Sequence, residues 1–168
     1  MFNFINRQLV ALAAFAIFTC ATAFGAYAEP PEGRPSTVVG AATVTDGDTI
    51  KVDGVKVRLN GFDTPERGRM CGRTDVYSQA SAALEDFIGS SEVTCKLTGD
   101  KTYDRFVGMC FIGGKDIGDF MVDAGWGRDW KRFSGGKYAA AEKEARKAQR
   151  GLWGLSCSEE LWGSRKYD

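Results

Sequence analysis

The sequence predicts an α+β fold that is mainly a β-barrel: a five-stranded Greek-key barrel of the oligonucleotide-binding (OB) type, with three helices. Five short β-rich runs occur along the chain, and a helical segment separates the third run from the fourth. Two further helical segments follow the fifth run. A helix inserted after the third of five short strands is typical of this barrel. The 168 residues suffice for one such domain.

The five β-rich runs are short and carry the β-branched and aromatic residues that strands favour. In the run 55–59 apolar and basic residues alternate, as they do in a half-buried strand. Asp53 and Gly54, directly before it, are a strong signal for a two-residue hairpin turn. The predicted strands are 37–44, 49–52, 55–59, 92–97 and 106–112.

Helical spacing of apolar residues predicts three helices, each followed by a glycine that can end it. The first has a side chain at its start, Thr74 or Asp75, that can cap the helix. Of the connecting segments, 66–73 is predicted to be a polar loop and 126–133 an extended aromatic and basic stretch. The predicted helices are 75–88, 116–124 and 136–150.

The first 28 residues are predicted to be a signal peptide. The apolar run 9–18 is too short to span a membrane comfortably, and Ala26-Tyr27-Ala28 supplies the small residues expected before a cleavage near Ala28-Glu29. Segment 29–36 holds three of the four prolines and is predicted to be a flexible lead-in. We expect an exported monomer, periplasmic or secreted, without stable membrane association.

The composition restricts the chemistry. The chain has 22 basic and 22 acidic residues, and loss of Arg7 with the signal peptide leaves a net charge of −1. This balance argues against a broadly basic nucleic-acid coat protein but leaves a local positive pocket open. The chain has no histidine, which excludes the usual Ser-His-Asp triads, Cys-His pairs and His-ligated zinc. Hydrolytic chemistry would then rely on carboxylates, arginines and a hard metal ion.

Four cysteines remain after the predicted cleavage: Cys71, Cys95, Cys110 and Cys157. None has CxxC spacing, which argues against zinc, and an even number in an exported chain indicates disulfides. Four cysteines allow three pairings. Cys95 and Cys110 lie on consecutive predicted strands, which favours that pair, and Cys71 with Cys157 then follows.

Acidic residues gather at two places in the predicted barrel. Asp46 and Asp48 lie just before the second strand, and Asp63 and Glu66 follow the third. The carboxylates of Asp48 and Asp63, with the carbonyl of Thr64, are the oxygen ligands that Ca²⁺ or Mg²⁺ prefers. Taken alone, the Asp-Gly-Asp segment is more readily explained as a tight turn.

Two arginines and a glutamate complete the candidate site. Arg58 and Arg105 could each hold a phosphate through two parallel hydrogen bonds, and Glu66 is the most credible group to take a proton from water or to orient it. The alternative for Arg58 is an ordinary ion pair with its acidic neighbours. The alternative for Arg105 is a pair with Asp104 or Asp100.

These segments, in this order, resemble the signatures of the staphylococcal nuclease (thermonuclease) family. The matching segments are 46–49, 58–59, 62–66, 103–105, 125–126, 133–138 and 151–153. The resemblance implies an SNase-like OB-fold nuclease domain at 37–155, followed by a C-terminal tail at 156–168 for which the sequence suggests no clear role. It also implies an endonuclease, a phosphodiesterase that uses Ca²⁺ to hydrolyse DNA and RNA to 3′-phosphate ends. Single-stranded substrates are expected to be favoured.

The resemblance also implies roles for individual residues. Asp48, Asp63 and Thr64 correspond to calcium ligands. The corresponding catalytic residues are Arg58, Glu66 and Arg105.

The expected substrate-binding residues include departures from the family pattern. Tyr103 matches a residue near the nucleotide phosphate. Lys101 stands where the family often has an aspartate, and Thr102 replaces a basic residue. Trp130 and Phe133 take the place of two tyrosines, and either can stack on a base. Both are explained equally well as ordinary core or rim aromatics.

Two other classes of function compete with catalysis. The first is an OB-fold module that binds single-stranded nucleic acid without cleaving it, since one fold serves many functions. The second is a disulfide-stabilised envelope protein with a structural Ca²⁺. A binding module needs no Arg58, Glu66 and Arg105 beside two metal-binding aspartates, so their joint presence favours an enzyme.

Overall fold

A computed structural model describes residues 36–167. The predicted signal peptide, and all of the predicted lead-in except Ser36, lie outside these residues. Within them the chain forms a five-stranded mixed β-barrel with three helices of seven or more residues, as the sequence predicts. The barrel strands are β1 (Thr37–Asp46), β2 (Thr49–Val52), β3 (Val55–Leu59), β7 (Glu92–Thr102) and β8 (Arg105–Ile112).

The barrel is closed by one parallel pairing. Neighbours in the order β3-β2-β1-β7-β8 pair antiparallel, and β3 then pairs parallel with β8, with Val57 opposite Phe106. The turn at Asp53 and Gly54 joins β2 to β3, and both residues have positive φ, 45° and 82°, which this hairpin turn requires. The register sets Thr49 opposite Arg58, so the start of β2 lies beside the end of β3.

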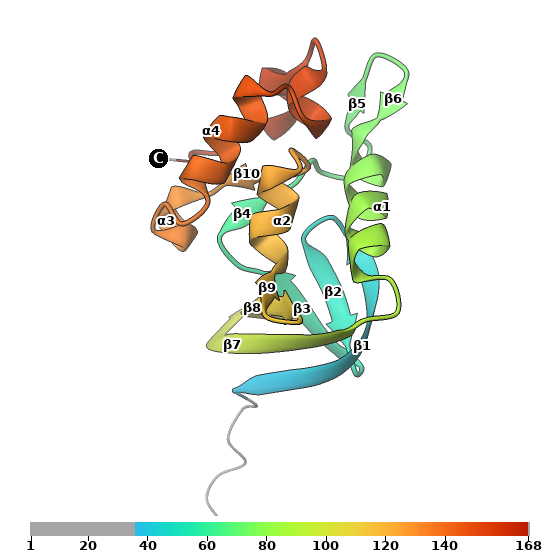
Figure 1. The fold of residues 1–168 in the computed structure, drawn as a ribbon, viewed down its shortest axis with the longest axis vertical. Coiled ribbons are helices and arrows are strands. Elements are labelled where there is room, and N and C mark those ends of the chain that lie inside the picture. The colour runs from blue at the N-terminus through green and yellow to red at the C-terminus, as the bar shows by residue number, and fades with distance from the viewer. Residues whose placement is uncertain (1–35, 168) are drawn as a thin grey trace, which may run out of the picture. The chain divides into compact units, whose positions relative to one another are not determined.

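Helix α1 (Val76–Ile88) begins at Asp75, whose carboxylate accepts the N–H of Ser78, and α2 (Ile117–Asp123) begins at Asp116 in the same way. The rings of Phe87 and Phe120 stack between the two helices, with centroids 3.7 Å apart. In Figure 1 both helices stand against one side of the barrel strands, and α4 (Ala139–Lys147) lies beyond α2. No helix between residues 36 and 167 is long and apolar enough to cross a membrane.

The buried side chains form two clusters. The larger fills the barrel and reaches α1 and α2, and it includes Val57, Phe62 and Leu84. The smaller lies around residues 152–167, where Trp153, Trp162 and Tyr167 pack with Cys71. The second cluster includes residues of η1 (Gly151–Gly154) and η2 (Ser158–Trp162). The tail expected to have no clear role is therefore packed against the domain.

Both favoured disulfides are confirmed. Cys95 and Cys110 are directly opposite on β7 and β8, with Cα atoms 4.0 Å apart. Cys71, on β5 (Met70–Cys71), is joined to Cys157, 86 residues later. The second bridge ties the start of the C-terminal tail to the region before α1.

Three predicted segments differ from the structure. The stretch 126–133 is extended only at β10 (Arg128–Asp129) and then turns into α3 (Lys131–Ser134). The predicted helix 136–150 is shorter, because the left-handed Gly136 (φ 84°) precedes α4 and Gln149 (φ 52°) follows it. The predicted loop 66–73 contains β5, which pairs with β6 (Thr74–Asp75). The remaining short strands are β4 (Phe62–Asp63) and β9 (Lys115–Asp116).

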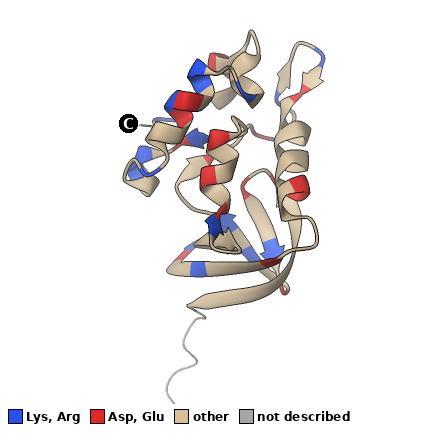
Figure 2. Ribbon diagram, viewed as in Figure 1, with Lys and Arg blue, Asp and Glu red and all other residues tan. Residues whose placement is uncertain are grey.

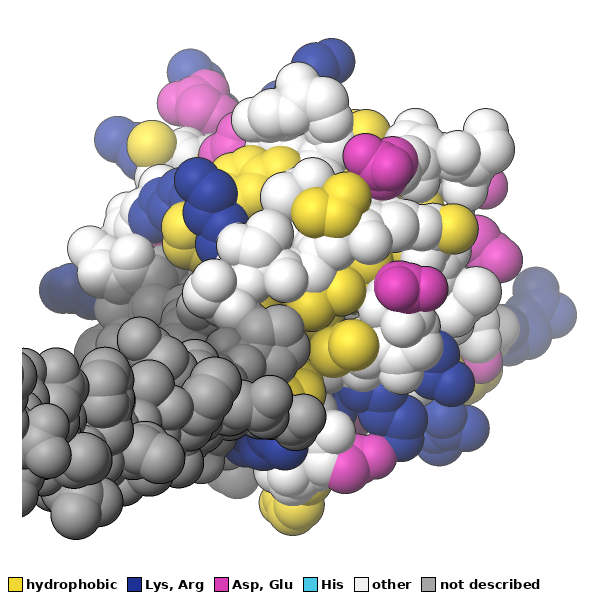
Figure 3. Space-filling view, turned by 90° about the horizontal axis from the view of Figure 1, so that it is seen from below, with side chains coloured by type: hydrophobic (Ala, Val, Ile, Leu, Met, Phe, Trp, Pro, Cys, Tyr) yellow, Lys and Arg dark blue, Asp and Glu magenta, His cyan; other side chains and the backbone are white. Residues whose placement is uncertain are grey.

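Acidic and basic residues are interspersed over the described elements (Figure 2). The face seen from below likewise mixes hydrophobic, basic and acidic side chains (Figure 3). This agrees with the equal numbers of acidic and basic residues in the sequence. A site for an anionic ligand on these faces must therefore depend on a local arrangement rather than on one broad basic surface.

Candidate active site

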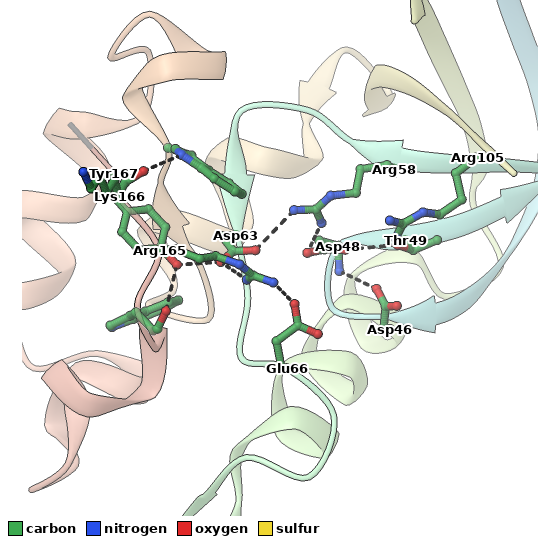
Figure 4. A network of polar contacts seen from close by, with 12 residues as sticks. Asp46, Asp48, Thr49, Arg58, Asp63, Glu66, Arg105, Arg165, Lys166 and Tyr167 are labelled. Atoms are coloured by element: carbon green, nitrogen blue, oxygen red, sulfur yellow. Dashed lines mark hydrogen bonds and ion pairs between the residues drawn. The ribbon is translucent and has the colours of Figure 1, made fainter. Parts of the chain in front are cut away.

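A cavity of about 440 Å³ opens beside the ends of β2 and β3. Its wall combines carboxylates and guanidinium groups with aromatic rings, and Figure 4 shows most of the charged ones. Pocket residues with charged or aromatic side chains are Asp46, Asp48, Glu66, Arg58, Arg67, Arg105, Arg165, Tyr77, Tyr103 and Trp130. The candidate metal ligand Asp63 is 1% exposed and lies beneath this surface.

Two short elements hold the aspartates in place. Asp63 ends β4, which pairs with β10 so that Asp63 faces Arg128, and the preceding Phe62 is buried in the barrel cluster. Asp48 lies in a turn in which its N–H donates to Asp46 Oδ1 at 3.2 Å. Asp46 therefore shapes the turn, as the turn interpretation of this acidic segment predicts, while Asp48 still faces the site.

Arg58 bridges the two aspartates. Its guanidinium contacts Asp48 Oδ2 through Nη1 and Asp63 Oδ1 through Nη2, the latter at 3.2 Å. Burial lowers the pKa of Arg58 below its ordinary value, and the nearby Asp63 carboxylate acts in the opposite direction. Arginine stays protonated even so. A buried cation between two carboxylates is thus the central contact of the site.

Arg105 enters the site from the start of β8. Its Nη1 donates to the hydroxyl of Thr49 at 2.9 Å, and that hydroxyl donates to Asp48 Oδ1 at 3.0 Å. The alternative partner Asp104 is held instead by Lys56, at 2.5 Å. Arg105 is therefore connected to the carboxylate cluster through one hydroxyl group.

Glu66 extends over the cavity and is 63% exposed. Its Oε1 is paired with Nη2 of Arg165. Arg58, which precedes Glu66 by eight residues in the sequence, is not its ion-pair partner among the described residues. Arg165 also contacts Asp63 Oδ2 through Nη1. The expected proximity of Arg58 to its acidic neighbours thus holds for Asp63, whereas Glu66 has a partner from the end of the chain.

The C-terminal segment supplies two site residues that sequence reasoning missed, Arg165 and Tyr167. The Tyr167 hydroxyl donates to Asp63 Oδ2 at 2.6 Å. Burial raises the pKa of Tyr167 above its ordinary value, and Asp63 adds to the effect, so the hydroxyl remains a donor. Burial lowers the pKa of Arg165, but Asp63 and Tyr167 together raise it more, so that it ends above its ordinary value. These contacts span about a hundred residues, and no local pattern signals them.

The expected substrate-binding residues do not all line the main cavity. Tyr103 lines the cavity and is 90% exposed. Trp130 lines it too, and shares a smaller adjoining cavity of about 150 Å³ with Phe133. The ammonium group of Lys101 lies over the ring of Phe106, 4.3 Å from its centroid. The structure thus brings Tyr103 and Trp130 to the main cavity and sets Phe133 at the adjoining one.

The oxygen atoms here suit a hard cation. Asp48 and Asp63 are close enough to share one guanidinium, so the pair already accommodates a positive charge, and Thr64 lines the cavity beside them. Between residues 36 and 167 there is no group of three or more Asp, Glu, His or Cys side chains that could hold a metal ion. Two carboxylates, a neutral oxygen and water form a set that Ca²⁺ or Mg²⁺ accepts.

Comparison with known proteins gives one consistent family. The family described as "Staphylococcal nuclease homologue" (SNase) matches residues 56–155. A succinoglycan biosynthesis protein, ExoI, of Rhizobium meliloti is 35% identical over 128 residues, covering 72% of this chain and 67% of that protein. A micrococcal nuclease of Shigella flexneri is 30% identical over 141 residues, covering 73% and 77%.

A probable endonuclease, lcl3, of Sclerotinia sclerotiorum is 29% identical over 126 residues. The match covers 68% of this chain and 48% of the fungal protein, so the chain spans about half of that relative's length. The names of these relatives thus include both nucleases and a succinoglycan biosynthesis protein.

Proposed function

Because the chain belongs to the staphylococcal nuclease family, we propose that it is a Ca²⁺-dependent endonuclease that hydrolyses DNA and RNA, single strands preferentially, to 3′-phosphate ends. The observation that carries the proposal is one cavity bordered by Arg58, Arg105 and Glu66, with the two buried aspartates of the site beside it. A module that only binds nucleic acid would need positive charge and aromatic rings. It would not need a carboxylate opposite two arginines.

The arginines act on the phosphate. Each guanidinium can donate two parallel hydrogen bonds to phosphate oxygens. Arg58 and Arg105 approach the cavity from adjacent strands, and together they stabilise the negative charge that grows on the phosphoryl oxygens in the transition state. Arg58 then exchanges at least one of its aspartate contacts for a contact with the substrate phosphate.

Asp48, Asp63 and Thr64 would hold the Ca²⁺ ion. When bound, this ion supplies positive charge beside the phosphoryl oxygen and can lower the pKa of a bound water. Glu66 accepts a hydrogen bond from the attacking water and orients it towards phosphorus. The water oxygen bonds to phosphorus as the bond from phosphorus to the 5′ oxygen breaks, so that the phosphate stays on the 3′ side. The proton that the water loses passes to the solvent, and the departing 5′ oxygen takes up a proton from the solvent and leaves as a hydroxyl group.

Export is also part of the proposal. Two disulfides join all four cysteines of the described residues, and disulfides persist in oxidising compartments. A protein that digests nucleic acid outside the cytoplasm would meet its substrate as free polymer. We place the site of action in a periplasm or outside the cell.

The proposal is tested by one pair of variants. Glu66→Gln keeps the size of the side chain but removes its charge, and we expect a loss of about 10²- to 10⁴-fold in the rate of cleavage of single-stranded DNA with Ca²⁺. Glu144→Gln makes the same change at an exposed position on α4 and should retain the wild-type rate. Circular dichroism checks that both variants fold.

Two results would decide against the proposal. The first is equal rates for Glu66→Gln and the wild type. The second is a wild-type protein that binds single-stranded DNA and leaves it intact with Ca²⁺ present. That second result would favour the binding module, for which the existing pairing of Glu66 and Asp63 with Arg165 is the supporting observation.

A further inference from the structure

We infer that two side chains of the C-terminal segment 163–167 belong to the candidate active site: Tyr167 positions Asp63, and Arg165 positions Glu66. The inference rests on the proposed function. It adds two positioning residues that lie beyond the residues 56–155 matched by the family.

Asp63 is held from two sides. Its Oδ1 faces Arg58, and its Oδ2 accepts from both Arg165 and Tyr167 (Figure 4). A buried carboxylate needs such partners, because burial without them is costly. The two contacts on Oδ2 fix the rotation of the carboxylate, so Oδ1 is the oxygen that faces Arg58. Because Arg58 also contacts Asp48, Oδ1 lies on the side of Asp63 that faces Asp48. The C-terminal segment thereby decides which oxygen of Asp63 is presented to the site.

Tyr167 is itself rigidly supported. Its ring lies 5.4 Å from the ring of Trp130 and 6.3 Å from that of Trp162, measured between centroids. The guanidinium of Arg128 covers it at 4.2 Å, and the side chain is only 8% exposed. A group locked by packing can hold a ligand at a defined angle, which a mobile tail cannot.

The backbone of the segment is fastened as well. The indole N–H of Trp130 donates to the carbonyl of Lys166 at 2.9 Å. At the start of the segment, Trp162 stacks on Trp153 with ring centroids 5.2 Å apart. The disulfide from Cys157 to Cys71 ties the preceding turn to β5. The segment 163–167 is thus held in place by contacts just before residue 163, at the carbonyl of Lys166 and at the side chain of Tyr167.

Arg165 holds the exposed carboxylate of the site. Its Nη1 contacts Asp63 and its Nη2 contacts Glu66, so one planar guanidinium sets the distance between the two carboxylates. Glu66 is 63% exposed, and no other ion pair is seen for it within residues 36–167. Without Arg165, Glu66 would sample many rotamers, and its alignment with a water molecule would be lost for much of the time.

The same contacts could instead belong to a strap that blocks the site. The two interpretations differ in the sign of one effect. If the segment positions Asp63 and Glu66, weakening it lowers both Ca²⁺ affinity and turnover. If it blocks the site, weakening it raises them. The buried, packed position of Tyr167 favours positioning.

The test measures Ca²⁺ binding by calorimetry, without substrate, and the kcat and KM for single-stranded DNA, all on the full exported chain. Tyr167→Phe removes only the hydroxyl and keeps the ring. We expect Ca²⁺ binding to weaken by about 10- to 100-fold, the usual cost of losing a partner of a metal ligand. Lys166→Gln is the control, because that side chain is exposed.

Arg165→Gln is the second variant, and it also serves if Tyr167→Phe fails to fold. We expect its kcat to fall by about 10-fold or more, and Arg165→Lys to recover part of the loss by restoring the charge without the planar fork. Lys166→Gln removes one positive charge from the neighbouring position. Its kcat should be unchanged. A loss of positive charge alone would change KM in both variants, whereas a loss of positioning would lower kcat only in Arg165→Gln.

Three outcomes would overturn the inference. Wild-type Ca²⁺ affinity and kcat in both Tyr167→Phe and Arg165→Gln would show that the segment is only structural. Higher affinity or activity in these variants would identify a blocking strap. A wild-type protein that neither binds Ca²⁺ nor cleaves DNA would overturn the proposed function, and the inference with it. An active wild type with unaffected variants overturns the inference alone.

Discussion

At Asp63, a carboxylate that is 1% exposed, three donors meet, and two of them come from a distant part of the chain. Arg58 comes from β3, while Arg165 and Tyr167 follow about a hundred residues later. The sequence predicts different roles for Asp63 and Glu66, one as a metal ligand and one as the group facing water. Their burial is consistent with this difference: Asp63 is almost fully buried, whereas Glu66 is 63% exposed. Because of its burial and its ion pairs, we expect Asp63 to be more sensitive to substitution than Glu66.

Asp63→Asn tests this sensitivity. The amide keeps the shape but leaves the largely buried Arg58 without half of its counter-charge, and breaking a buried ion pair costs about 3 kcal/mol or more. We expect the free energy of unfolding, measured with urea, to fall by about that amount and Ca²⁺ binding to be lost. Asp86→Asn, on the exposed face of α1, should change neither. Normal stability of Asp63→Asn would contradict the account of this cluster.

At the scale of elements, local signals were sufficient for the barrel. The predicted strands 49–52 and 55–59 have the observed bounds, because Asp53-Gly54 is a turn signal contained in two residues. The predictions were wrong or incomplete where contacts between residues far apart in the sequence determine the local structure. Trp130 donates its backbone N–H to Gly61 and so bends the stretch that was expected to be extended. The contacts of Tyr167 and Arg165 with Asp63 lie far outside any sequence window, which is why the role of the tail was missed.

The start of α1 gives a prediction about pH. Hydrogen bonds from the backbone and hydroxyl of Ser78 lower the pKa of Asp75 below its ordinary value. Since the folded value is the lower one, the stabilisation is fully present above about pH 3.9, the ordinary value of an aspartate. It is lost as the pH falls through the folded pKa.

Asp75→Asn keeps a capping side chain that cannot ionise. Its Tm should be below that of the wild type at pH 7, and the difference should vanish at strongly acidic pH. Thermal unfolding followed by circular dichroism across this range measures the difference. A gap in Tm that grows as the pH falls would contradict the assigned sign.

The two disulfides give a prediction at the same scale. Replacing Cys71 and Cys157 with serine opens the longer loop, of 86 residues, and should cost about 4.6 kcal/mol by loop entropy. It should also weaken Ca²⁺ binding, because the segment carrying Tyr167 is loosened. Replacing Cys95 and Cys110 opens a loop of 15 residues and should cost about 3 kcal/mol.

The Cys95 and Cys110 variant is the matched control for the first. Its bridge lies between β7 and β8 in the barrel cluster, whereas Tyr167 packs in the smaller cluster, so Ca²⁺ affinity should stay at the wild-type value. Urea unfolding and calorimetry report the two quantities separately. Equal loss of Ca²⁺ affinity in both variants would show that the effect is general destabilisation.

For the molecule as a whole, the barrel defines the fold, and the proposed function depends on one cavity. Acidic and basic residues balance and are interspersed (Figure 2), so a nucleic acid would be held by local contacts and not by a broad basic surface. An OB-type barrel serves many functions, and the names of the relatives are correspondingly mixed. The residues of the cavity, and not the barrel, carry the proposal of catalysis.

The central claim is tested most directly by incubating the purified wild-type protein with a single-stranded DNA oligonucleotide and analysing the products by mass spectrometry. With Ca²⁺ present we predict fragments that end in a 3′-phosphate, and with a chelator we predict intact oligonucleotide. Intact oligonucleotide after long incubation with Ca²⁺, or fragments formed equally well with the chelator, would contradict the proposal of a Ca²⁺-dependent nuclease.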